Sequence, residues 1–228
     1  MTINRRTRIK ICGLCDAETA RAAAEAGADA IGLVFVTGSP RQVTLDQAKV
    51  IVDALPIFVE PIALFVNAPI AHVRNTATAL GIGTVQLHGE ESPQDVKALA
   101  PLRVIKYLPF DANLPTKTIA PWQSAPNNLA AILFDVCALE SGAAARGGTG
   151  RRLDWNALSS LKNDGMFQGL APMILAGGLN PKNVIQAIER VRPFGVDVSS
   201  GVESVRGVKD CEMISQFCGA VHDADQKT

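Results

Sequence analysis

The chain has 228 residues, a length that suits one domain of above-average size. Its 22 Lys and Arg residues balance its 22 Asp and Glu residues, so no net field favours nucleic acid or an anionic membrane surface as a partner. Five scattered cysteines do not form a secreted disulfide framework, and no run of 18 apolar residues occurs. We therefore expect a cytoplasmic protein with reduced thiols.

A short strand at residues 8–13 opens the chain, and an Ala-rich helix at residues 17–26 follows it. Apolar runs then predict further strands at residues 27–35, 61–66, 83–89, 103–107, 131–135, 172–178 and 195–201. Further helices are predicted at residues 44–55 with Thr44 as N-cap, 70–80, 92–99, from Asp154, 183–191 and 209–221, before a polar tail. Four prolines between residues 108 and 128 predict a short or distorted fifth helix.

Eight strand-then-helix units without a composition break predict a parallel sheet closed into a (β/α)8 TIM barrel, as a single domain over residues 1–228. The competing fold is an open, doubly wound sheet. The first turn holds Cys12-Gly13-Leu14-Cys15, which lacks the glycine fingerprint of a dinucleotide-binding fold.

Candidate functional residues gather at the predicted strand ends. They are Cys12, Arg41, His88, Asp135, Gly177 with Gly178, and Asp197 to Gly201. A barrel would bring these ends to one rim. Any one of them could equally be a loop cap, but the set favours function.

A phosphate site is predicted where strands seven and eight end. Gly177 and Gly178 follow one strand, and Ser199, Ser200 and Gly201 follow the other. Barrels commonly bind phosphate there through backbone N–H groups and a short extra helix. Either turn alone could be structural, whereas two neighbouring ones favour phosphate.

Two other motifs carry less weight. Residues 142–150 have P-loop spacing without its Gly-Lys-Ser/Thr ending, and their many small residues lead us to interpret them as a lid, with plain flexibility as the alternative. Cys12 and Cys15 form C-x-x-C, but no second pair supports a zinc site, and we predict no metal.

Cys12 and Asp135 could form an acid and base pair. Cys12 would need neighbouring cations or donors to be a thiolate at neutral pH, whereas apolar walls would raise the pKa of Asp135 and keep it protonated. Such a pair on opposite sides of a sugar suits an isomerase. Lys10 shares a strand face with Cys12 and could form an ion pair with Asp197 inside the barrel mouth, and we favour a structural role for Lys10 over a catalytic one.

The chain resembles the phosphoribosylanthranilate isomerase family of tryptophan biosynthesis from residue 8 to about residue 219. The resemblance rests on Lys10-Ile11-Cys12-Gly13, Gly27-Ala28-Asp29-Ala30-Ile31-Gly32, Ser39-Pro40-Arg41, Gln86-Leu87-His88-Gly89, Gly147-Gly148-Thr149-Gly150 with Asp154-Trp155, Ala176-Gly177-Gly178-Leu179, and Val196-Asp197-Val198-Ser199-Ser200-Gly201-Val202-Glu203 with Gly207, Lys209 and Asp210.

The resemblance implies a cofactor-free Amadori rearrangement of N-(5'-phosphoribosyl)anthranilate to 1-(2-carboxyphenylamino)-1-deoxyribulose 5-phosphate. It implies Asp135 as general acid, Cys12 as general base and Arg41 as the partner of the anthranilate carboxylate. It also implies a phosphate grip formed by the glycines and serines after strands seven and eight. We assign His88, Gly148 and Asp197 to substrate binding as well, and we expect a monomer.

Two alternatives stay open. The related isomerase of histidine biosynthesis performs an Amadori reaction, but its family has an aspartate where this chain has Cys12, and its substrate needs two phosphate sites. A phosphate-sugar binding protein on a barrel would keep the grip without turnover. The presence of both Cys12 and Asp135 favours an enzyme.

Overall fold

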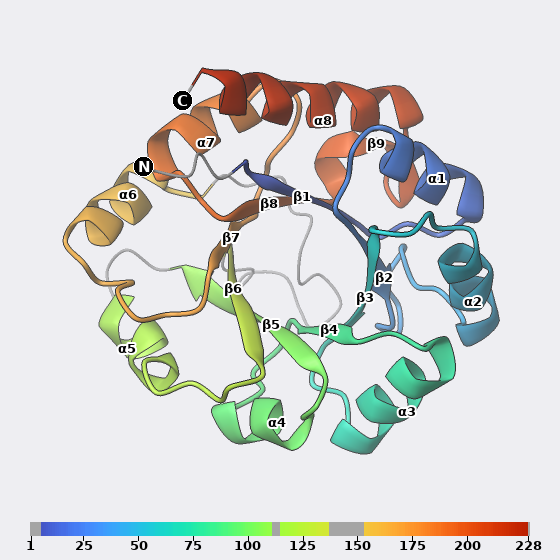
Figure 1. The fold of residues 1–228 in the computed structure, drawn as a ribbon, viewed down its shortest axis with the longest axis horizontal. Coiled ribbons are helices and arrows are strands. Elements are labelled where there is room, and N and C mark those ends of the chain that lie inside the picture. Colours follow the sequence, from blue (N-terminus) through green and yellow to red (C-terminus); the bar gives the residue numbers. More distant parts are fainter. Residues whose placement is uncertain (1–5, 111–114, 137–152, 228) are drawn as a thin grey trace.

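The computed structural model describes residues 6–110, 115–136 and 153–227, and it confirms the predicted barrel. Eight parallel strands pair in sequence order, and β1 pairs with β8 to close the ring (Figure 1). The strands are β1 (Arg8–Cys12), β2 (Ala30–Val34), β3 (Glu60–Phe65), β4 (Thr84–Leu87), β5 (Arg103–Phe110), β6 (Leu129–Val136), β7 (Met173–Leu175) and β8 (Gly195–Val198).

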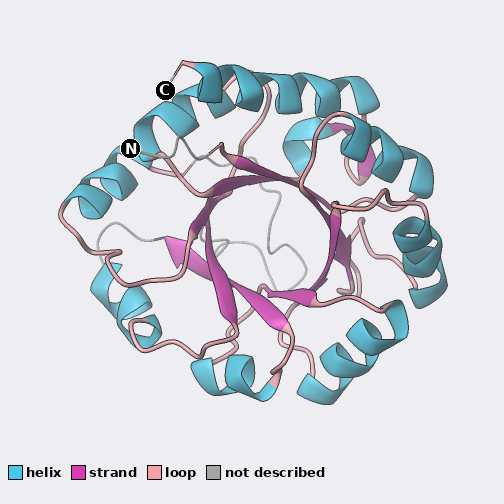
Figure 2. Ribbon diagram, in the orientation of Figure 1, coloured by secondary structure: helices cyan, strands magenta, loops and turns pink. Residues whose placement is uncertain are grey.

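Helices form an outer layer around this ring (Figure 2). They are α1 (Ala17–Glu25), α2 (Leu45–Asp53), α3 (Ile70–Leu80), α4 (Pro93–Ala98), α5 (Pro115–Ile119), α6 (Trp155–Asn163), α7 (Val184–Val191) and α8 (Cys211–Gln226). As the proline content predicted, the fifth helix is short, and the 3₁₀ helix η1 (Ala120–Trp122) continues it. Thr44 is the N-cap of α2, in a capping box with Gln47.

The core has two parts because the strands are buried on both faces. Strand residues such as Ile11, Phe65 and Leu175 pack outward against the helices. A separate cluster fills the inside of the barrel: Ile62, Ile105, Ala131, Leu133, Ile174 and Ala176. At the next level along the barrel, Cys12 packs with Val34 and Leu64. The interior is therefore packed, and its C-terminal end contains the thiol.

The C-terminal prediction was wrong in two respects. Lys209 lies in a small antiparallel pair, β9 (Glu203–Val205) and β10 (Val208–Lys209), and α8 begins two residues later with Asp210 as N-cap. The helix also continues through the predicted polar tail, since Ala224 is buried and Asp225 accepts hydrogen bonds from the backbone N and Oγ1 of Thr7 at 2.7 Å. No helix within the described ranges has the length and apolar character needed to cross a membrane.

Candidate active site

The predicted site residues that the structure describes gather at the C-terminal ends of the barrel strands. Cys12 is the last residue of β1, His88 directly follows β4, and Asp135 is the penultimate residue of β6. The glycines and serines follow β7 and β8, as predicted. Gly148 and the predicted lid at residues 142–150 lie outside the described residues. The barrel thus brings together groups that are far apart in the sequence.

A small cavity of about 40 Å³ lies between the ends of β6, β7 and β8. Its lining residues are Asp135, Ala176, Gly177, Gly178, Leu179, Asp197, Val198, Ser199, Ser200 and Gly201. Gly177 and Gly178 have positive φ angles of 87° and 68°, a conformation that side chains rarely adopt. The cavity therefore joins the predicted acid to the predicted phosphate residues.

Gly201 and a 3₁₀ helix shape the β8 side of this cavity. The predicted eighth strand was too long at its end, because β8 stops at Val198 and Ser200–Val202 form the 3₁₀ helix η2, the kind of short extra helix that often accompanies a phosphate site in barrels. A Cβ atom on Gly201 would lie 1.8 Å from the carbonyl oxygen of Leu179, so only glycine fits there. This close approach brings the turns after β7 and β8 side by side, and both turns line the cavity.

Cys12 is a buried thiol beside a buried ion pair. It is only 6% exposed, and burial raises its pKa more than Lys10 and Lys209 lower it. The predicted ion pair is confirmed, with 2.8 Å between Lys10 Nζ and Asp197 Oδ1. Burial alone would lower the pKa of Lys10, but Asp197 and Cys12 outweigh it and raise the pKa.

Arg41 is held by a carboxylate to which the sequence analysis gave no role. Its Nε and Nη2 atoms donate to the two oxygens of Glu203 at 2.6 and 2.9 Å, and Lys209 Nζ lies 2.7 Å from the same carboxylate. Burial would raise the pKa of Glu203, but hydrogen bonds from Arg41 and Lys209 lower it to about 2. Among the described residues, Nη1 of Arg41 has no hydrogen bond. This edge of the guanidinium is the one that a ligand carboxylate could use.

Gly13 explains how Arg41 reaches the barrel rim next to Cys12. A Cβ atom at Gly13 would lie 2.5 Å from Cδ of Arg41, so the glycine makes room for the arginine side chain. Lys209 also donates to the carbonyl oxygen of Ser199 at 2.9 Å. This bond connects the ion pairs of Glu203 with Arg41 and Lys209 to the turn after β8. The only sequence signal for Glu203 and Lys209 was their place in the family motifs.

His88 is fixed by a second buried network. Its ring stacks on Tyr107 with 4.2 Å between centroids, and Gln86 Nε2 lies 2.9 Å from its Nδ1. Lys106 Nζ donates to Glu91 at 2.8 Å and to the carbonyl oxygen of Gly89 at 2.7 Å, so a buried charge pair holds the loop after β4. Lys106 and Glu91 were not predicted, because their residue types and spacing match no motif.

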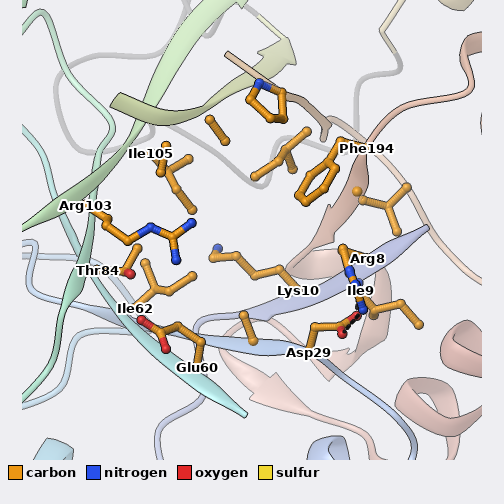
Figure 3. A pocket seen from close by; sticks show the side chains of 17 residues that line it. Arg8, Ile9, Lys10, Asp29, Glu60, Ile62, Thr84, Arg103, Ile105 and Phe194 are labelled. Carbon is orange, nitrogen blue, oxygen red and sulfur yellow. Dashed lines mark hydrogen bonds and ion pairs between the residues drawn. The ribbon is translucent and has the colours of Figure 1, made fainter. Parts of the chain in front are cut away.

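A larger cavity of about 320 Å³ lies at the opposite, N-terminal end of the barrel (Figure 3). Its rim includes Arg8, Glu60 and Arg103, which begin β1, β3 and β5, and Arg8 pairs with Asp29 at 3.2 Å. None of the predicted catalytic groups lines it. The smaller cavity is the candidate site, because the acid, the glycines and the serines meet there.

Within the described residues, no cluster of three His, Cys, Asp or Glu side chains is placed to hold a metal.

Comparisons with known proteins agree on one family. Residues 9–220 match the family described as N-(5'phosphoribosyl)anthranilate (PRA) isomerase. N-(5'-phosphoribosyl)anthranilate isomerase of Pelobacter propionicus is 42% identical over 212 residues, which cover 92% of this chain and 93% of the relative.

Solved structures agree. The crystal structure of phosphoribosyl anthranilate isomerase from Thermotoga maritima superposes with a TM-score of 0.82 at 34% identity, over 95% of this chain and 99% of that one. A second crystal structure of such an isomerase, in complex with reduced 1-(o-carboxyphenylamino)-1-deoxyribulose 5-phosphate, gives a TM-score of 0.80 at 32% identity, over 95% and 99% of the two chains. This chain therefore belongs to the N-(5'-phosphoribosyl)anthranilate isomerase family and is an isomerase with the family's barrel fold.

Proposed function

We propose that the chain converts N-(5'-phosphoribosyl)anthranilate to 1-(2-carboxyphenylamino)-1-deoxyribulose 5-phosphate in tryptophan biosynthesis, with Asp135 as general acid and Cys12 as general base. The observation that carries the proposal is the placement of both groups at one barrel mouth, beside a glycine- and serine-lined cavity, in a chain of this family. A relative is solved with a reduced form of the corresponding product, which supports the same ligand class here.

The proposed reaction consists of proton transfers and bond shifts within the substrate. Asp135 protonates the furanose ring oxygen, the C1'–O bond breaks, and the nitrogen lone pair forms a protonated Schiff base. The Cys12 thiolate removes the C2' proton, and the electron pair moves into a C1'–C2' double bond to give an enolamine. Protonation at C1' and loss of the 2'-hydroxyl proton then give the ketose. Electrons and atoms balance without an external oxidant or reductant, so no redox cofactor is needed.

The surrounding residues support a substrate with an anionic group at each end. The turns after β7 and β8 line the small cavity, and their backbone N–H groups would bind the phosphate. Arg41, fixed by Glu203, would hold the anthranilate carboxylate through its remaining edge. His88, directly after β4, and Asp197, which lines the small cavity, are proposed to contact the substrate as well. The cytoplasmic location and the monomeric state stay predictions; a Thermotoga maritima relative is described as dimeric, with monomers generated from it.

The test is turnover of the proposed substrate. Purified, reduced protein is mixed with fresh N-(5'-phosphoribosyl)anthranilate in D₂O, and the loss of anthranilate-type fluorescence is followed. We expect rapid decay and a product that carries one deuterium on C1', since C1' takes its proton from solvent. A protein that binds the substrate but leaves its fluorescence and mass unchanged would refute the proposal and favour a phosphate-sugar binding protein.

A further inference from the structure

The buried pair of Lys10 and Asp197 lies inside the barrel between its two ends. Lys10 and Asp197 are register partners on β1 and β8, and their side chains are 5% and 8% exposed. Figure 3 shows the Lys10 side chain crossing the middle of the N-terminal cavity, which it lines. Its ammonium reaches Asp197, which lines the cavity at the catalytic end. A fixed positive charge therefore lies beneath the candidate site.

Gly32 on β2 brings this charge close to Cys12. A Cβ atom on Gly32 would lie 2.7 Å from Cys12 Sγ and 3.1 Å from Lys10 Nζ. The sulfur and the ammonium nitrogen therefore flank the same glycine and are no farther apart than those two distances combined. At such a separation inside a protein, a positive charge strongly favours an ionised partner.

We propose that Lys10 is the counter-ion of the Cys12 thiolate and that Asp197 positions its ammonium for this role. The inference rests on the proposed function, in which Cys12 acts as the base. A thiolate that is only 6% exposed needs a cation within reach, because burial disfavours its charged form. Lys10 is therefore a positioning residue that acts through Cys12, with no contact to substrate.

The other charged groups around Cys12 are bound elsewhere. Lys209 on β10 also favours the thiolate, but its ammonium donates to Glu203 and to the carbonyl oxygen of Ser199. The charge of Cys12 contributes to raising the pKa of Arg41, but the Nε and Nη2 atoms of Arg41 donate to Glu203.

Two carboxylates neutralise the cations near Cys12. Asp197 disfavours the thiolate and is the partner that neutralises Lys10, while Glu203 neutralises Arg41 and Lys209. Of the charged groups, Lys10 lowers the pKa of Cys12 most, and Asp197 follows with the opposite sign. Substitutions of these two residues should therefore shift the thiol titration in opposite directions.

The test is a direct titration of Cys12, which needs no turnover. The thiolate absorbance near 240 nm is followed against pH, and the curve of the matching Cys12→Ser protein is subtracted in each background. We expect Lys10→Met to raise the midpoint by about one unit or more, a tenfold loss of thiolate at a given pH, and Asp197→Asn to lower it. The acid limb of the kcat/KM profile should shift in the same direction.

A double variant keeps the test decisive if Lys10→Met leaves Asp197 unpaired and fails to fold. Lys10→Met with Asp197→Asn removes both charges, and its midpoint should lie above that of the wild type because Lys10 has the larger effect. A purely structural role predicts unchanged midpoints in every folded variant and would overturn the inference. An active Cys12→Ser protein would instead refute the proposed base, whatever the titration gives.

Discussion

Glu203 is the residue whose loss should have the most clearly quantifiable cost. Its side chain is 3% exposed and accepts hydrogen bonds from Arg41, Lys209 and the backbone N–H of Gly207 at 2.6 to 3.0 Å. These contacts lower its pKa from 4.5 to about 2. At 1.36 kcal/mol for each pH unit, the ionised form contributes about 3 kcal/mol to the free energy of unfolding at neutral pH.

The sign of the pH dependence follows from the lowered pKa. A carboxyl whose pKa is lower in the folded than in the unfolded state stabilises the fold above pH 4.5, and this stabilisation is lost as the pH falls towards 2. By pH 3, about 2 of the 3 kcal/mol should be gone. Glu203→Gln should thus cost about 3 kcal/mol at pH 7 and only about 1 kcal/mol at pH 3.

Urea unfolding of wild type and Glu203→Gln at both pH values measures this difference. The exposed Glu189→Gln is the matched control, because it removes one carboxylate from the surface of α7 and should cost little at either pH. Other carboxyl groups titrate alike in the compared proteins and cancel. A Glu203→Gln cost that is the same at pH 7 and pH 3, or below about 1 kcal/mol at pH 7, would refute the reasoning.

Three further predictions concern the site. Gly201→Ala should raise KM at least about tenfold or destabilise the fold by about 1–3 kcal/mol, because the new Cβ atom would collide with the Leu179 carbonyl oxygen. The control Gly219→Ala in α8 should do neither, because the space around its Cβ position is open. Steady-state kinetics and thermal melts check both variants. Arg41→Lys should raise KM more than it lowers kcat, since lysine lacks the bidentate fork, and an unchanged KM would contradict the carboxylate role. Inorganic phosphate should inhibit the enzyme competitively. Gly178→Ala should weaken that inhibition, because the φ angle of 68° at this position is one that alanine rarely adopts. Equal phosphate inhibition constants for the wild type and Gly178→Ala would count against the phosphate cavity.

The sequence predicted most of the fold because its signals are local. The helix at residues 70–80 has the predicted bounds, and Thr44 caps α2 as expected, since caps and apolar periodicity lie within a few residues of each helix. The end of α8 was wrong because its stability depends on Asp225 bonding Thr7, 218 residues away. The β9–β10 pair was missed because it is short and carries no alternating apolar pattern.

The same distinction applies to the site. The pair of Lys10 and Asp197 could be predicted, because barrel closure makes β1 and β8 neighbours and both residues point inward. The pair of Arg41 and Glu203 spans 162 residues and joins two loops, so its geometry depends on turns that periodicity does not determine. The roles of His88, Gly148 and Asp197 in substrate binding stay predictions.

The most direct test of the central claim compares the kcat of four variants with that of the wild type. Cys12→Ser and Asp135→Asn remove the proposed base and acid, while Cys211→Ser and Asp223→Asn make the same chemical changes at exposed positions in α8. We predict that each of the first two lowers kcat by about 10² to 10⁴ and that the controls retain wild-type rates. Near-wild-type turnover by a folded Cys12→Ser or Asp135→Asn protein would contradict the account.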